Sequence, residues 1–306
     1  LDFKPIVEAS PPESQPIEKA LPPNAVYSSE EDPPKGTQIF YSDDRNKPYW
    51  IRSPKQVLFK NTIDDLMKNP SKTIDNLISS NNFEEINNLK NVKQRSDAHP
   101  EGDVLTHTKM TLNEAKKLLT KDPDTRDFSK EDKEIVMLAA LTHDFGKPKT
   151  TDSEGKAFGH DKAGVEPTFS FLNKITSNKE IISTVTSLVR DHLIPAQYYR
   201  QKDSIKESTL KKFYNNKVEQ HGHRYIDLLT TLARADMLGR GYANDEAADW
   251  FKDKIKSISF NIEQEGDSQG WYGRTAASNP RTQQLGKAED IFLSKLDATD
   301  ITMIAT

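Results

Sequence analysis

Apolar residues that recur every three or four positions between residues 100 and 262 are the feature that most restricts the fold. In the segment 129–142, for example, Ile135, Leu138 and Thr142 fall on one helical face. No alternation typical of strands interrupts the pattern, so the sequence predicts an all-α protein. Helices are expected at residues 104–119, 129–142, 162–175, 178–191, 205–216, 222–238 and 244–262.

The N-terminal segment is dominated by proline and polar residues. Ten of the 17 prolines fall in residues 1–54, among Glu and Ser. Such a composition cannot bury enough apolar surface to offset the entropy of the chain. Residues 1–37 are therefore predicted to form a disordered or extended arm, which is a candidate site for a protein partner.

The rest of the chain divides by composition. Aromatic residues around Tyr41 and Trp50 favour a short hairpin, apolar trios over residues 55–91 favour short helices, and residues 285–296 favour a further helix. The predicted organisation is an arm (1–37), a small irregular and helical region (38–98), a helical core (99–262) and a polar tail with a short helix (263–306).

Composition also excludes several classes of protein. The mean hydropathy is -0.78, and no run of about 18 apolar residues exists, so we expect no membrane span and a cytoplasmic location. The net charge is only -4, so any phosphate recognition must be local. The absence of cysteine excludes thiolate metal sites and leaves nitrogen and oxygen ligands. The start at Leu1 favours a processed or trimmed piece of a longer chain.

The adjacent residues His143 and Asp144 form the strongest functional motif. They end an apolar helix, and residues 145–148, Phe-Gly-Lys-Pro, supply the stop. At a helix end, an imidazole and a carboxylate that are adjacent in sequence can both reach one cation. Other histidines at predicted helix ends are His107, His160, His192 and the pair His221 and His223. A lone histidine is more often a hydrogen-bonded core residue, and this alternative stays open for His107.

Two acidic residues near helix ends are open to a functional and a structural interpretation. Asp236 is a single carboxylate on an otherwise apolar helix, where it is costly without a cation or a donor. Pairing with Arg234 or Arg240 is the ordinary explanation. Asp191 and Arg190 fit a solvated helix face.

The order of His107, His143-Asp144 and Asp236 resembles the HD superfamily of metal-dependent phosphohydrolases. Within that superfamily the chain is similar to the HD portion of bacterial CCA-adding tRNA nucleotidyltransferases and their stand-alone relatives. The matching stretches are HPEGDVLTHTKMTL at 99–112, LAALTHDFGKP at 138–148, GHDKAG at 159–164, RDHL at 190–193 and ARADMLGRG at 233–241. The signature of the nucleotidyltransferase head does not occur in this sequence, so nucleotide addition is not expected of it.

The resemblance implies an HD-domain helical bundle and a role for each matching residue. The residues that resemble the ligands of the core metal are His107, His143, Asp144 and Asp236. The residues that resemble those holding a second metal or the substrate phosphate are His160 and His192, either of which is also a candidate general acid. Lys147 resembles the cation placed against the scissile phosphate, and Arg240 resembles an arginine that supports Asp236 or an anionic substrate. Arg190 is a further candidate for substrate binding. Leu238 departs from the pattern, because a basic residue is often found there.

The implied ligand set has a definite chemistry. A divalent ion held by imidazole and carboxylate groups acidifies bound water and neutralises phosphoryl oxygens, and Asp144 is the natural bridge between two ions. Mixed nitrogen and oxygen ligands suit one or two ions of Mn, Fe, Co, Ni or Zn. We therefore expect a hydrolase of the EC 3.1 class that acts on a phosphomonoester or cyclic phosphodiester of a nucleotide or an RNA end.

Two alternatives remain open from the sequence. The Pro-rich arm and polar tail also fit an HD-fold scaffold or interaction subunit of a larger assembly, with little or no catalysis. The mixture of basic residues and tyrosines in residues 190–225 suits phosphate contact and base stacking, but it also fits a solvated helix face with tyrosines packed on the core.

Overall fold

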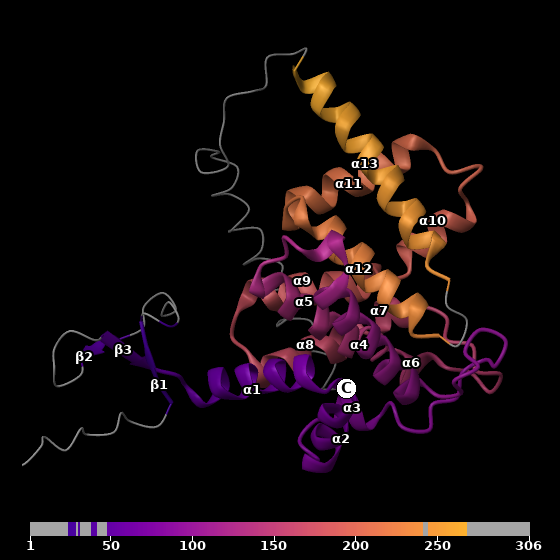
Figure 1. Ribbon diagram of the computed structural model, residues 1–306. Helices are drawn as coiled ribbons and strands as arrows, with labels where there is room; N and C mark the ends of the chain where they lie inside the picture. The colour runs from indigo at the N-terminus through magenta and orange to yellow at the C-terminus, as the bar shows by residue number, and fades with distance from the viewer. Residues whose placement is uncertain (1–23, 29, 31–37, 42–47, 241–243, 268–306) are drawn as a thin grey trace, which may run out of the picture.

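The structure is a computed structural model that describes residues 24–28, 30, 38–41, 48–240 and 244–267. Most of these residues are helical, so the predicted all-α class is confirmed (Figure 1). The helices are α1 (Pro54–Lys68), α2 (Pro70–Ser80), α3 (Glu84–Asn87), α4 (Val104–Lys121), the 3-10 turn η1 (Pro123–Thr125), α5 (Lys130–Thr142), α6 (Lys147–Thr150), α7 (His160–Ala163), α8 (Val165–Ile175), α9 (Lys179–Asp191), α10 (Ile194–Arg200), α11 (Glu207–His221), α12 (Arg224–Leu238) and α13 (Glu246–Asp267). The predicted tail helix at 285–296 lies outside the described residues.

A small antiparallel sheet precedes the helices. Its strands are β1 (Ala25–Tyr27), β2 (Phe40–Tyr41) and β3 (Pro48–Ile51), in the order β1-β3-β2. The pairing of β2 with β3 is the short hairpin that the aromatic residues predict. Strand β1 lies within the segment predicted to be a disordered or extended arm, and it pairs with β3, with Val26 opposite the buried Trp50. Most of that segment lies outside the described residues.

Helices α4, α5, α9 and α12 pack together at the centre of the molecule. Helix α5 packs against α4, α9 and α12, and all of its residues from Ile135 to Thr142 are buried. A helix that is apolar on every side is expected at the centre of a bundle. The packing brings the C-terminal ends of α5 and α9 to the sides of α4 and α12. No helix within the described ranges has the length and apolarity that crossing a bilayer requires.

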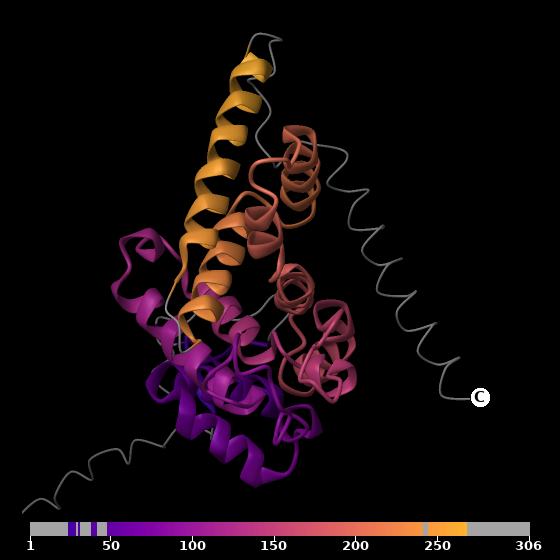
Figure 2. The ribbon, with the colours of Figure 1, turned by 90° about the vertical axis from the view of Figure 1, so that its right-hand side faces the viewer.

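Three helical segments differ from the expectation. The helix predicted over 162–175 is two helices, α7 and α8, which meet at Gly164. The residues after His192 form an unpredicted short helix, α10, with Pro195 in its first turn, where a missing N–H group costs nothing. Helix α13 extends to Asp267, beyond the predicted start of the polar tail. Figure 2 shows α13 as a long rod that rises from the body, with α10 and α11 beside it.

Candidate metal centre

Five helices each direct polar side chains into one buried region. Helix α4 supplies one histidine, the C-terminal end of α5 supplies an adjacent histidine and aspartate, α7 begins with a histidine, a histidine caps α9, and α12 supplies an aspartate. These residues are His107, His143, Asp144, His160, His192 and Asp236. None of the six is more than 8% exposed. The structure therefore brings together all six predicted metal-binding residues, which are spread over 130 positions from 107 to 236.

The first part of this cluster joins α4, α5 and α12. His107 Nε2 lies 2.9 Å from Asp236 Oδ1 and 3.4 Å from His143 Nε2. His143 Nε2 lies 3.3 Å from Asp144 Oδ2. Nitrogen and oxygen atoms at such distances can bind one ion, and the ligand atoms of His107, His143 and Asp144 all lie within 4.8 Å of one another.

The second part of the cluster shares Asp144 with the first. The ligand atoms of Asp144, His160 and His192 again lie within 4.8 Å of one another, and His160 Nε2 is 3.5 Å from Asp144 Oδ1. Asp144 Oδ1 is buried and accepts no hydrogen bond from the described residues. A buried carboxylate oxygen without a donor is costly. A cation would satisfy it, so the residues present fit a metal ion.

The histidine rings are oriented by hydrogen bonds on the side away from the cluster. In His143, His160 and His192, Nδ1 lies 2.5 to 2.9 Å from the carbonyl oxygen of the third residue before it. A carbonyl oxygen can only accept, so Nδ1 carries the proton and Nε2 keeps its lone pair. The three Nε2 atoms therefore face the cluster as acceptors, which is the arrangement that a metal-binding histidine requires.

His107 is oriented by a carboxylate that the sequence interpretation did not select. Its Nδ1 lies 2.9 Å from Glu101 Oε1, and the same oxygen lies 2.8 Å from His99 Nδ1. Burial opposes ionisation of Glu101, but its hydrogen bonds with His107, the backbone and His99 lower its pKa to about 2. Burial, together with the nearby charges of Lys147 and His107, lowers the pKa of His99 to about 4. Both residues lie in the stretch at 99–112 that resembles the HD superfamily. This resemblance was the signal in the sequence that could have identified them.

Two cations pair with the carboxylates of the cluster. Lys147 Nζ lies 2.7 Å from Asp144 Oδ2 and also donates to the Gln94 side chain. Arg240 Nη2 donates to Asp236 Oδ2 at 2.7 Å, whereas Arg234 pairs elsewhere, with Asp122 and Asp245. The predicted support of Asp236 by Arg240 is thus observed, and pairing of Asp236 with Arg234 is not.

The charges in the cluster set which protonation states are stable. Burial raises the pKa of Asp144, but electrostatic interactions with His143 and Lys147 outweigh it and hold that pKa well below its usual range. Arg240 and His107 do the same for the pKa of Asp236. Burial and the neighbouring His143 and His160 lower the pKa of His192 to about 3. Near neutral pH, therefore, both carboxylates are ionised and His192 is neutral, as metal ligation requires.

Gly146 lets the turn after Asp144 lie against α7. A Cβ atom at this position would meet the His160 carbonyl oxygen at 2.0 Å and the Gly164 nitrogen at 2.6 Å. Only glycine fits this close approach of two backbones. The glycine in the HDFGKP stretch thus holds His160 beside Asp144.

Some predicted residues lie apart from the cluster. Arg190 is exposed, and its Nε lies 3.4 Å from Asp191 Oδ1. The interpretation of Asp191 as part of a solvated face is wrong, because its carboxylate is buried and is bonded by Tyr225 Oη at 2.7 Å and Lys217 Nζ at 2.6 Å. The remaining two histidines bond to hydroxyl groups outside the cluster, His221 to Ser187 and His223 to Tyr214.

Comparison with known proteins agrees with this geometry. Residues 104–238 match the family described as HD domain, and this range contains all six residues of the cluster. Residues 104–238 are an HD domain. HD domains are in general metal-dependent hydrolases, and the buried histidines and aspartates here can hold a metal ion.

The chain is also similar to curated bacterial proteins. A multifunctional CCA protein from Neisseria meningitidis serogroup C is 34% identical over 150 residues, which cover 47% of this chain and 33% of that protein. The multifunctional CCA protein from Neisseria gonorrhoeae is 32% identical over 150 residues, covering 47% and 34%. That from Actinobacillus pleuropneumoniae serotype 5b is 27% identical over 166 residues, covering 54% and 38%. The matched part of the HD-domain chain spans about a third of the length of these relatives.

Proposed function

We propose that this chain is a phosphohydrolase that uses a divalent transition metal to hydrolyse a phosphomonoester or cyclic phosphodiester of a nucleotide or an RNA end. The main support is the position of Asp144 between two groups of buried histidines, with one oxygen that accepts no hydrogen bond from the described residues. A carboxylate shared in this way suits two ions held close together. The CCA proteins that resemble the HD domain support an RNA-end or nucleotide substrate.

His107, His143, Asp144 and Asp236 would hold one ion, and Asp144, His160 and His192 would hold a second. When bound, such an ion supplies Lewis-acid stabilisation of the phosphoryl oxygens and an acidified water. Mn, Fe, Co, Ni or Zn all suit these ligands. The neutral state of His192 fits a ligand better than a proton donor, because its pKa is lowered to about 3. When only the first ion is bound, His160 is not a ligand and remains the candidate general acid to the leaving oxygen.

Lys147 and Arg240 would provide the positive charge of the site. Lys147 is buried against Asp144, so its charge lies beside the position where a scissile phosphate would be bound. Arg240 keeps Asp236 ionised, since its charge is the largest influence that lowers the pKa of that carboxyl. Arg190 remains a predicted substrate contact, but its exposed side chain lies apart from the cluster.

Base stacking by the tyrosines of residues 190–225 has little support. Tyr198 packs against Phe213 with ring centroids 5.8 Å apart, and Tyr199 packs against Trp250 at the same separation. Tyr214 is buried. The contacts of Tyr198 and Tyr199 join α10 to α11 and to α13, which favours the structural interpretation of this segment.

Catalysis is preferred to a scaffold role because all six candidate ligands lie in the cluster. The test is hydrolysis by the full chain, loaded in turn with Mn, Co, Ni or Zn, of 2′,3′-cyclic nucleotides, mononucleotides and RNA with a terminal phosphate. We expect Asp144→Ala to lose about a thousandfold or more in kcat/KM. Asp161→Ala, which changes an acid on α7 outside the cluster, should behave as the wild type. A wild type inert on every substrate, or an active Asp144→Ala variant, would refute the proposal.

A further inference from the structure

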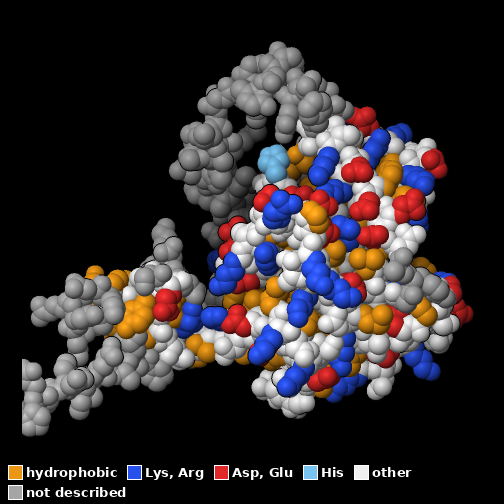
Figure 3. All heavy atoms as spheres, in the orientation of Figure 1, with side chains coloured by type: hydrophobic (Ala, Val, Ile, Leu, Met, Phe, Trp, Pro, Cys, Tyr) orange, Lys and Arg blue, Asp and Glu red, His pale blue; other side chains and the backbone are white. Residues whose placement is uncertain are grey.

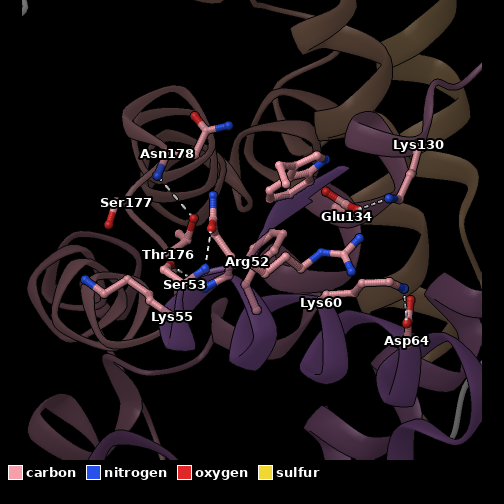
Figure 4. Close-up of a pocket in the computed structure, with 13 residues that line it drawn as sticks. Arg52, Ser53, Lys55, Lys60, Asp64, Lys130, Glu134, Thr176, Ser177 and Asn178 are labelled. Carbon is pink, nitrogen blue, oxygen red and sulfur yellow. Dashed lines mark hydrogen bonds and ion pairs between the residues drawn. The ribbon is translucent and has the colours of Figure 1, made fainter. Parts of the chain in front are cut away.

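A cavity of about 740 Å³ lies where the sheet meets the helical body, between β3, the start of α1, the start of α5 and the turn before α9 (Figure 4). Its volume is typical of pockets that enclose a small organic ligand. Figure 4 shows Lys55 and residues 176–178 on one side and Lys60 and Lys130 on the other, with Arg52 between them.

The cavity is a separate site from the histidine cluster. Helices α5 and α9 both begin at the cavity and end at the cluster. Lys130 is 13 residues before His143, and Asn178 is 14 residues before His192. At 1.5 Å per helical residue, each helix sets the two sites about 20 Å apart. A ligand in the cavity therefore cannot touch the cluster unless it is longer than a single nucleotide.

Positive charge is in excess around the cavity. Four cationic side chains, Arg52, Lys55, Lys60 and Lys130, line it with two carboxylates, and four minus two leaves a net charge of +2. The carboxylates belong to ion pairs within single helices, Lys60 with Asp64 and, at 3.8 Å, Lys130 with Glu134. The lysine side chain of each pair is at least 37% exposed, so water screens the pair and a stronger anion can rearrange it. Figure 3 shows several Lys and Arg side chains at the junction of the sheet and the helical body.

The backbone adds to this positive field. Lys55 Nζ donates one of its three N–H groups to the Asn173 carbonyl oxygen. This hydrogen bond holds the ammonium group near the turn before α9. Helices α1, α5 and α9 all begin at the lining residues, so the positive ends of three helix dipoles lie around the same space. Together with the side chains, they favour a phosphate group.

The cavity also offers flat apolar surfaces. Phe59 on α1 is half-buried in the lining. The Arg52 guanidinium group lies 5.3 Å from the centre of the Trp50 ring, which is only 1% exposed and therefore lies beneath it. A guanidinium plane held on an aromatic ring, like a phenyl ring, is a surface on which a nucleobase stacks.

We propose that this cavity binds a phosphorylated nucleoside, either free or as one nucleotide of an RNA strand. Lys55 and Lys130, on opposite sides of the cavity, provide the positive charge that attracts the phosphate, and Phe59 and Arg52 contact the base. The proposal goes beyond the hydrolase function, because none of these residues belongs to the metal cluster. An RNA strand bound here would be held about 20 Å from the phosphate that reacts.

The test is the binding of adenosine 5′-monophosphate, a short single-stranded RNA and inorganic phosphate to the metal-free full chain, measured by calorimetry. The variants are Lys55→Glu, Lys130→Glu and Phe59→Ala. We expect the two charge reversals to weaken binding of the nucleotide or RNA about tenfold each. Lys117→Glu is the matched control for Lys130→Glu, since Lys117 has similar exposure, 61% against 67%, and also pairs with a glutamate on its own helix.

The outcomes distinguish a free nucleotide from RNA as the ligand, and the cavity from the metal cluster as the binding site. Binding of the mononucleotide, or of RNA alone, that is weakened about tenfold in Lys130→Glu but unchanged in Asp144→Ala supports the proposal. Phosphate that binds as tightly as the nucleotide overturns it, because the base would then contribute nothing. Nucleotide binding that is lost in Asp144→Ala and kept in Lys55→Glu and Lys130→Glu also overturns it. The proposal is likewise overturned if neither the mononucleotide nor the RNA binds to the wild type. None of these results depends on whether the chain hydrolyses phosphate esters.

Discussion

At the scale of single residues, the cluster is defined by what bonds to the outer nitrogen of each imidazole. Three histidines donate to a backbone carbonyl, whereas His107 faces the buried carboxylate of Glu101. A carboxylate in this position makes the ring a stronger metal ligand and fixes its orientation. Glu101 is therefore a positioning residue, although it does not face the cluster itself.

Glu101→Gln should weaken metal binding by about 10- to 100-fold, because the amide keeps the shape of the carboxylate but loses its charge. The measurement is competition of the purified chain with a chelator of known affinity. Glu114→Gln, which changes an acid on the outer surface of α4 that pairs with Lys117, is the matched control. Equal affinities for the wild type and Glu101→Gln would contradict this role.

His221 gives a pH-dependent contribution to stability outside the cluster. Burial and the nearby Lys217 charge lower its pKa from 6.5 to about 4. Between these values the unfolded chain binds a proton that the folded chain does not, so stability is present above pH 6.5 and is lost as the pH falls toward 4. His221→Gln, which keeps a donor for Ser187, should reduce this acid loss by about 2 kcal/mol. Urea unfolding at pH 7 and pH 4.5 measures it, and equal pH dependence in both proteins would refute it.

The resemblance to the HD superfamily predicted the six clustered residues, whereas the residue pattern by itself indicated a functional site only at the adjacent His143 and Asp144. Neither predicted the partners of Asp191, since Lys217 and Tyr225 are 26 and 34 positions away and only packing brings them close. Glu101 was missed because it lies in a short irregular segment, where no periodicity of apolar residues indicates which side chains are buried.

At the scale of elements, α9 joins two buried polar groups at its C-terminal end. His192 faces the cluster, and Asp191, on the preceding residue, faces α11 and α12. Sequence periodicity located α9 and most other helices but not α10, whose seven residues are too few to show a stripe. The break between α7 and α8 was also missed, because it depends on the approach of Gly146 to Gly164.

Lys217→Met should destabilise the chain by about 3 kcal/mol, because it leaves the Asp191 carboxylate buried without its cation. The double variant with Asp191→Asn should recover part of that loss. Urea unfolding is the measurement, and Lys212→Met, an exposed lysine on the same helix, is the control. A loss no greater than that of Lys212→Met would show that the ion pair contributes nothing to α9 packing.

At the scale of the whole molecule, a metal ion in the cluster would connect helices α4, α5, α7, α9 and α12. A ligand that binds only the folded state stabilises it by about 2.7 kcal/mol at a hundred times its Kd. Saturating Mn or Zn should therefore raise the melting midpoint by about 5 to 10 °C, and a chelator should reverse the rise. Asp144→Ala should show no rise, and a metal-independent midpoint in the wild type would contradict the connection.

The most direct test of the proposed metal centre is the metal content of the purified chain, measured by elemental analysis after dialysis against metal-free buffer. We expect one or two equivalents of a divalent transition metal in the wild type and loss of that metal in both Asp144→Ala and His143→Ala, with the helical content of each variant unchanged by circular dichroism. A wild type that holds no metal after loading, or folded variants that hold as much as the wild type, would contradict it.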